Sequence, residues 1–256
     1  MDADHAPDPA QRARTTAMPP PPDPAILRGM PLFAGLDAEA LAEAVALARP
    51  RLHVRGTAVF SQGEAAAAGH ALIDGRVKIV QTGPDGQQVV MRFIGPGEMF
   101  GTLAIFTDGF YPADAVAVAD CVELSWPAVA MTELIDRHPA IARNALSIVG
   151  GRLREVQNRL REVATERVER RIAHALLRLV RHAGRRVEAG VEIDFPLSRQ
   201  DVAEMTGTTL HTVSRTLSAW ESQGIVESGR QQVVIRKPHA LVAIAEDLPS
   251  PAPRRE

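Results

Sequence analysis

Cysteine is almost absent from the chain, since only one of its 256 residues, Cys121, is a cysteine. A single cysteine excludes an intramolecular disulfide, a four-cysteine zinc site and an iron–sulfur cluster held only by cysteines of this chain. Cys121 lies in an apolar stretch, which predicts a buried, unreactive thiol.

Long apolar runs are also missing. No stretch approaches the roughly 18 residues needed to cross a bilayer, so we expect no membrane segment. Residues 1–24 are rich in Pro and Ala and lack the apolar core of a secretory signal. We expect them and residues 247–256 to be disordered tails, and the absence of an export signal predicts a cytoplasmic location.

Net positive charge is lacking over the whole chain, whose formal net charge is −2. Residues 151–237, however, hold 16 Lys and Arg against 11 Asp and Glu, an excess of five positive charges. The remainder holds 13 against 20. This asymmetry indicates that the C-terminal part faces a polyanion.

The motifs of common enzyme classes are absent as well. There is no phosphate-binding loop, no GxGxxG dinucleotide fingerprint, no His-Glu-x-x-His zinc motif and no Ser or Cys nucleophile motif with a paired base. We therefore expect a protein that is not an enzyme.

Residues 25–137 have the pattern of a small β-domain behind a short helix at 37–48. Between Leu52 and Ser125, β-rich runs alternate with Gly-containing turns. The runs Val77–Gln81 and Gln88–Ile94 flank Gly83-Pro84-Asp85-Gly86, which predicts a hairpin, and 113–124 is another expected strand region. Short strands with regular turns predict a β-barrel or β-roll.

A narrow apolar stripe marks the next segment and predicts a long helix over 138–165. Apolar residues recur there at spacings of three and four, with Arg and Glu on both sides, as in a coiled-coil seam. We expect this helix to dimerise, the alternative being that it packs on its own domain; Gly150 and Gly151 interrupt its early part. The seam consists of Leu146, Val149, Leu153, Val156, Leu160 and Val163.

Residues 166–246 read as a winged helix-turn-helix. A helical pattern over 167–182 ends at Gly184, and 187–195 is expected to be extended. Ser198 and Asp201 resemble a capping box, Gly207 suits the turn, and a second helix from 208 or 209 to about 223 buries an apolar face. A β-hairpin wing over 224–236 follows, so the fold class is α+β.

The quoted residues carry a resemblance to the Crp/Fnr family over roughly residues 30–245. The motifs are Leu197-Ser198-Arg199-Gln200-Asp201-Val202-Ala203, the Gly turn, Thr212-Val213-Ser214-Arg215-Thr216-Leu217, the wing, and the hairpin from Gly75-Arg76-Val77-Lys78 to Gly95-Pro96-Gly97-Glu98-Met99-Phe100-Gly101. The resemblance implies a cyclic-nucleotide-binding-like β-roll, a long dimerisation helix and a DNA-binding C-terminal domain. Implied partners are double-stranded DNA, a second copy of the chain and RNA polymerase.

The resemblance also assigns roles to residues of the second helix. It implies that Ser214 and Arg215 read bases in TTG-type half-sites and that Arg199 contacts phosphate; Thr209, His211 and Thr212 complete the expected interface. Fnr-like proteins usually carry Glu where this chain has His211, and Leu210 replaces the Arg of the cyclic-AMP branch. A carboxylate only accepts hydrogen bonds, so His211 leaves the neighbouring base preference open, and a spectator role is equally open.

The effector is less defined. The cyclic-AMP branch holds its ligand with an Arg-Ser pair and a Glu, whereas this chain reads Gly101-Thr102-Leu103 and Tyr111-Pro112-Ala113-Asp114-Ala115, with no cation, so cyclic AMP is not expected.

The remaining resemblance, to the nitric-oxide-responsive Dnr/NnrR branch, implies an activator of nitrogen-oxide genes and haem as a candidate cofactor. His70 is then the first candidate ligand, with His53, His138 and His174 behind it and a packed or surface histidine as the alternative for each. Other readings are a regulator of another small molecule or redox signal without haem, and a β-roll signalling module that does not act on DNA.

Overall fold

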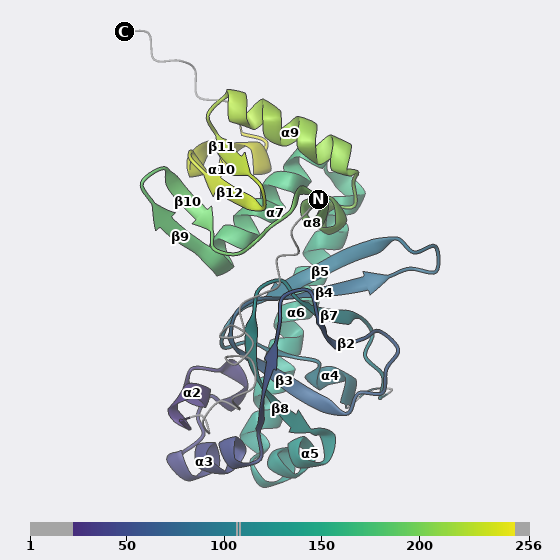
Figure 1. The fold of residues 1–256 in the computed structure, drawn as a ribbon, viewed down its shortest axis with the longest axis vertical. Helices are drawn as coiled ribbons and strands as arrows, with labels where there is room; N and C mark the ends of the chain where they lie inside the picture. Colours follow the sequence, from purple (N-terminus) through teal and green to yellow (C-terminus); the bar gives the residue numbers. More distant parts are fainter. Residues whose placement is uncertain (1–22, 106, 108, 249–256) are drawn as a thin grey trace, which may run out of the picture.

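The computed structural model describes residues 23–248 except 106 and 108. The tails expected at 1–24 and 247–256 therefore fall almost wholly outside the described residues. The chain forms two lobes joined by one long helix (Figure 1). The N-terminal lobe contains α2 Ala25–Arg28, η1 Pro31–Phe33, α3 Ala38–Ala46, β1 Arg49–His53, β2 Ala58–Phe60, β3 Ala68–Asp74, β4 Val77–Thr82, β5 Gln88–Ile94, β6 Met99–Phe100, α4 Thr102–Ile105, β7 Asp114–Ala117, β8 Cys121–Pro127 and α5 Ala128–Arg137.

The N-terminal lobe is the expected β-roll. Two four-stranded sheets, ordered β1-β8-β3-β6 and β2-β7-β4-β5, pair their neighbouring strands antiparallel. The hairpin of β4 and β5 has the predicted turn and lies at the edge of the N-terminal lobe that faces the C-terminal lobe, with its turn projecting sideways (Figure 1). Trp126 is fully buried and donates through Nε1 to the carbonyl of Ala44 at 2.7 Å, which ties the sheet to α3. Cys121 is buried, as predicted, and burial raises the pKa of its thiol.

The strand region expected over 113–124 is two strands in two different sheets. β7 pairs with β4, whereas β8 pairs with β1 and β3. The chain turns between them at 118–120, where the Asp120 carboxylate accepts a hydrogen bond from the Arg55 amide at 2.8 Å. The sequence does not mark this crossover, because both strands are largely buried and have the same mainly apolar composition.

A single helix, α6 Pro139–Thr165, links the lobes. It runs through Gly150 and Gly151 without a break, so these glycines do not interrupt it. Asn144 anchors its first part to the N-terminal lobe by donating to the carbonyls of Leu32 and Ala34, both at 2.9 Å. No helix in the described part of the chain is both long and apolar enough to cross a membrane.

The C-terminal lobe, as far as the structure describes it, places two longer helices and two helices of eight residues around a small sheet. Residues 187–195, expected as one extended segment, form most of a hairpin that starts at Gly184, and the sheet order is β11-β12-β10-β9. The core contains Leu176, Val213, Leu217 and Trp220, all at most 1% exposed. The elements are α7 Val168–Ala183, β9 Gly184–Val187, β10 Gly190–Ile193, α8 Arg199–Thr206, α9 Leu210–Ser222, β11 Val226–Gly229, β12 Gln232–Ile235 and α10 Pro238–Ala245.

Candidate nucleic-acid interface

The helix-turn-helix is built from local signals in the sequence. Ser198 caps α8 by accepting from the Asp201 amide at 3.0 Å, and the Asp201 carboxylate accepts from the Ser198 amide at 3.0 Å, which completes the predicted capping box. Gly207 ends α8 in the left-handed conformation, at φ 61°. Thr209 then caps α9 by accepting from the Thr212 amide at 3.2 Å. Both helices therefore begin directly after a residue whose side chain caps them.

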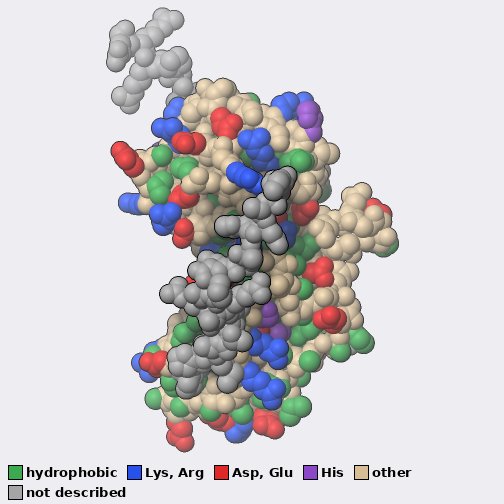
Figure 2. Space-filling view, in the orientation of Figure 1, with side chains coloured by type: hydrophobic (Ala, Val, Ile, Leu, Met, Phe, Trp, Pro, Cys, Tyr) green, Lys and Arg blue, Asp and Glu red, His purple; other side chains and the backbone are tan. Residues whose placement is uncertain are grey.

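One face of α9 is open to solvent. His211 and Arg215 are exposed and Ser214 is half-buried, whereas Val213 and Leu217 are fully buried on the opposite side. Basic and histidine side chains lie at the surface over α9 (Figure 2). A surface helix that presents small polar groups and an arginine fits the major groove of DNA.

Unlike Arg215, Arg199 has polar contacts with neighbouring side chains of the lobe. Its Nη2 donates to Ser228 Oγ at 2.9 Å and lies 3.7 Å from Glu221 Oε1, so it joins the start of α8 to the wing and to α9. Glu221 also accepts from the Ser228 amide at 3.0 Å. The side chain is 35% exposed, which leaves part of the guanidinium open to a phosphate.

The apolar seam of α6 is uncovered in the single chain. Five of its six side chains are at least half exposed, from 50% for Val156 and Val163 to 73% for Leu146; the sixth, Val149, is half-buried beside the β-roll. A helix that used this stripe to pack on its own domain would bury it. The exposure therefore favours a partner helix over the alternative.

Arg159 connects all three parts of the molecule. It lies on α6, and its guanidinium donates to the carbonyls of Met91 and Val90 on β5, the latter at 3.2 Å, and to that of Met205 on α8 at 3.1 Å. Sequence reasoning missed this residue, because an arginine beside a heptad seam is ordinarily solvated and nothing local marks it.

Two ion pairs reinforce the same junction. Lys78 on β4 lies 2.9 Å from Asp201, the carboxylate that also completes the capping box of α8. Arg178 on α7 donates to both carboxylate oxygens of Glu162 on α6, at 2.7 and 2.8 Å. The hairpin of the β-roll and the long helix thus contact the helix-turn-helix directly.

The β-roll contains an apolar pocket of about 60 Å³ against α6. Its polar lining side chains are Thr102 and Arg152. The expectation that no cation lies near the Gly101-Thr102-Leu103 segment is therefore wrong: Arg152 and Arg92 both donate to the carbonyl of Met99, at 2.8 and 3.1 Å. These arginines come from α6 and β5, so the sequence around Thr102 could not reveal them.

The proposed haem ligand His70 is enclosed in a hydrogen-bonded network. Its Nδ1 lies 3.1 Å from Glu123 and its Nε2 3.1 Å from the hydroxyl of Tyr111. Tyr111 donates its one proton to the carbonyl of Ala68 at 2.7 Å, so the bond to Nε2 requires a proton on that nitrogen. The ring also packs against Phe60 and Phe100, with centroids 5.2 Å away in both cases.

Each of the other candidate histidines has one ring nitrogen, Nε2, close to a carboxylate. His53 lies 3.1 Å from Glu123, His138 2.8 Å from Glu43 and His174 3.4 Å from Glu166. A haem ligand needs an unprotonated nitrogen facing open space, which His70 lacks on both sides. The described residues around His70 therefore do not fit a haem.

Comparisons with known proteins agree with this architecture. Residues 50–138 match the model of the cyclic nucleotide-binding domain, and residues 170–244 match that of the Crp-like helix-turn-helix domain. The cyclic AMP receptor protein of Thermus thermophilus is 33% identical over 219 residues, covering 86% of this chain and 98% of that protein. The nitrogen fixation regulation protein FixK of Azorhizobium caulinodans is 28% identical, covering 77% and 79%.

A solved structure shows the same fold. FixK2 from Bradyrhizobium japonicum superposes with a TM-score of 0.68 at 24% identity, over 80% of this chain and 99% of that one. A relative in Mycobacterium tuberculosis, 28% identical over 82% of this chain and 94% of that protein, is named as a CRP-like cAMP-activated global transcriptional regulator. With its β-roll, long helix and Crp-like helix-turn-helix, the chain belongs to the Crp/Fnr family of DNA-binding transcription regulators that carry an effector-binding domain.

Proposed function

We propose that the protein is a homodimer that reads a palindromic DNA site through α9, with Ser214 and Arg215 contacting bases of TTG-type half-sites. The observation that carries this proposal is the open face of α9, on which Arg215 is exposed beside Ser214. A guanidinium fork donates two hydrogen bonds to O6 and N7 of guanine, which distinguishes that base by about 1–3 kcal/mol. Thr209, Thr212 and Arg199 border the same face and contact the backbone.

The exposed seam of α6 supplies the dimer. Two copies of α6 would cover the side chains of Leu146, Leu153 and Leu160 in each other, and this pairing sets the distance between the two α9 helices. Paired recognition helices read half-sites about one helical turn, ~34 Å, apart.

Effector binding in the β-roll then acts on DNA through α6. Arg159 holds β5 and α8 to the same helix, so a ligand that changes the packing of the β-roll against α6 also shifts the helix-turn-helix. Activation through contact with RNA polymerase is the output we propose. Because His70 does not fit a haem, nitric oxide sensing through haem forms no part of this proposal.

Cyclic AMP is one candidate effector, favoured by Arg152, which lines the β-roll pocket together with Thr102. An arginine supplies the charge that a cyclic phosphate needs. Against it, the 60 Å³ pocket is apolar apart from these two residues, and Asp114 adds a negative charge to the segment after Tyr111. Titration calorimetry with cyclic AMP at fixed salt tests this candidate: saturable binding supports it, and absence of binding excludes it.

Fluorescence anisotropy with a TTG-N8-CAA palindrome and a scrambled duplex, at one salt concentration, tests the DNA assignment. Arg215→Ala is expected to lower the preference for the palindrome by about 10- to 100-fold, while Arg199→Ala weakens binding to both duplexes alike. Arg186→Ala is the matched control, since Arg186 is an exposed arginine on β9. It should change neither the preference for the palindrome nor the affinity for either duplex. Wild-type specificity in Arg215→Ala would refute the role of α9.

A further inference from the structure

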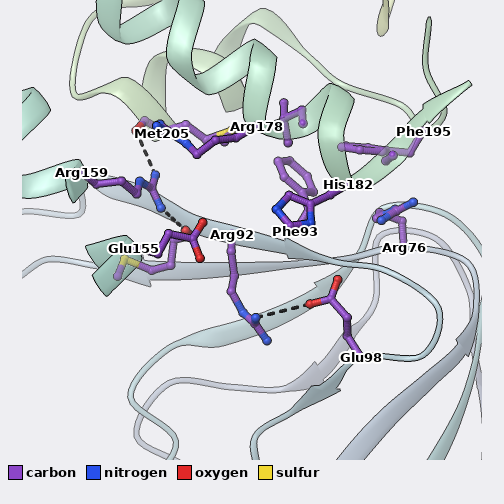
Figure 3. A pocket seen from close by; sticks show the side chains of 13 residues that line it. Arg76, Arg92, Phe93, Glu98, Glu155, Arg159, Arg178, His182, Phe195 and Met205 are labelled. Atoms are coloured by element: carbon purple, nitrogen blue, oxygen red, sulfur yellow. Dashed lines mark hydrogen bonds and ion pairs between the residues drawn. The ribbon is translucent and has the colours of Figure 1, made fainter. Parts of the chain in front are cut away.

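A second cavity lies where the β-roll, α6 and the C-terminal lobe meet, and neither the DNA-reading face nor the Thr102 pocket includes it. Its volume is about 60 Å³. Figure 3 shows side chains from β5, α6 and α7 converging on it. Six of the lining residues are charged: Arg76, Arg92, Arg159, Arg178, Glu98 and Glu155.

Arg76 is the unusual member of this group. Its side chain is nine-tenths buried, and its Nε has no hydrogen-bond partner among the described residues. The guanidinium stacks 4.8 Å above the ring of Phe195, which holds it in place without neutralising it. Gly95 makes room for it, because a Cβ on that residue would stand 2.5 Å from Arg76 Nη1.

The charge of Arg76 is costly where it lies. Burial lowers the pKa of this guanidinium, and the carboxylates of Glu98 and Asp194 act on it only through space. A buried charged donor without a hydrogen-bonded partner destabilises a fold. Most such groups therefore have a partner, and a bound water or ion can serve as that partner in place of a protein group.

Among the described residues, no carboxylate forms a hydrogen bond or an ion pair with Arg76. Glu98 lies 3.4 Å from Arg92, and Glu162 accepts from Arg178. Arg159 is held by carbonyl oxygens. Four arginines and two glutamates line the cavity, and Glu162, outside the lining, pairs with Arg178, so one positive charge is in excess.

We propose that this cavity binds one small planar oxyanion per protomer, with the Nε edge of the Arg76 guanidinium as its main ligand. At about 15 Å³ per water, a volume of 60 Å³ holds about four waters, which matches a group of three or four non-hydrogen atoms. Formate, nitrite, nitrate and bicarbonate have that size, as does the carboxylate end of a larger organic acid. A guanidinium fork fits such a group bidentately.

The cavity also lies where a bound ligand would regulate DNA binding, and this point rests on the proposed function. The anion would touch residues of β5, α6 and α7 at once, so its binding energy differs between arrangements of the two lobes. A ligand with such a difference shifts the population of the DNA-binding arrangement.

Isothermal titration of the full-length protein, dialysed into a buffer free of these oxyanions, tests the site. The probes are formate, nitrite, nitrate and bicarbonate, with succinate to represent a larger acid. We expect saturable binding of at least one of them at one per protomer, weakened at least tenfold by Arg76→Gln. If only succinate binds, the ligand is a larger acid; if the small ions bind, it is a free oxyanion.

Gly95→Ala gives a second variant that keeps the arginine but displaces its guanidinium, and it should weaken binding similarly. Arg28→Gln, an exposed arginine on α2, should bind like the wild type. Arg76→Gln removes no hydrogen bond of its Nε, and circular dichroism checks that it folds. Absence of saturable binding, or wild-type affinity in Arg76→Gln, overturns the site.

DNA affinity with and without the saturating anion tests the regulatory role separately. A change of threefold or more in the wild type, absent in Arg76→Gln, supports it. Anion binding with unchanged DNA affinity overturns the regulation and leaves the site intact. If the protein binds no DNA under any condition, the proposed function fails, while the anion titration keeps its meaning.

Discussion

Acid should destabilise the β-roll through one carboxyl group, Glu123. It lies on β8 and is 1% exposed, with His70 at 3.1 Å from one oxygen and His53 at 3.1 Å from the other. Burial raises the pKa of this carboxyl, but the contacts with the two histidines outweigh burial and hold the pKa at about 2, below its ordinary 4.5.

The direction of the pH effect follows from this shift. A carboxyl whose pKa is lower in the folded state contributes stability that is complete above pH 4.5 and is lost as the pH falls toward 2. The difference between 4.5 and about 2 corresponds to about 3 kcal/mol, of which about 2 kcal/mol is lost between pH 5 and pH 3.

Urea unfolding of the wild type and of Glu123→Gln at several pH values between 5 and 3 measures this contribution. Trp126 on β8 becomes the only tryptophan in a Trp220→Phe background, so its fluorescence follows the β-roll alone. We expect the difference in free energy of unfolding between wild type and Glu123→Gln to shrink by about 2 kcal/mol over this range.

The matched control is Glu39→Gln, an exposed carboxyl on α3 in the same lobe. Its difference from the wild type should stay constant over the same range. A Glu123→Gln difference that is also flat between pH 5 and pH 3 would refute the reasoning.

Two further predictions concern the dimer and the junction between the lobes. Leu160→Glu should raise the dimer dissociation constant at least 100-fold, because it puts a charge into the seam of both copies. Val129→Glu is the control and should leave this constant unchanged, since Val129 lies on α5 and is 70% exposed. Sedimentation equilibrium measures the constant, and an unchanged dimer in Leu160→Glu would refute the seam assignment. Asp201→Ala should lower the free energy of unfolding of the C-terminal lobe, followed by Trp220 fluorescence, by about 1–3 kcal/mol, since it removes a capping box and an ion pair. Lys78→Met removes the ion pair alone, so equal losses in both variants would show that the capping box contributes nothing.

Local and periodic features of the molecule could be predicted from the sequence. The β4–β5 hairpin has the predicted turn, Ser198 and Asp201 form their capping box, and Gly207 takes the left-handed conformation. Each depends on residues within a few positions of one another, so the chain chemistry alone specifies it. The α6 seam is periodic and its side chains are largely exposed in the single chain, and pairing of two copies through it stays a prediction.

Long-range arrangement was decided only by the tertiary structure. The run over 113–124 splits between two sheets because its two halves pair with strands far apart in the chain. His70 resembled a candidate ligand until the fold placed Glu123 and Tyr111 against both of its nitrogens. Nothing in the sequence marks Arg76 or Arg159, yet packing of the lobes buries Arg76 without a partner for its Nε and places the guanidinium of Arg159 against both β5 and α8. Burial and pairing depend on which distant segments meet, and the sequence does not state those contacts locally.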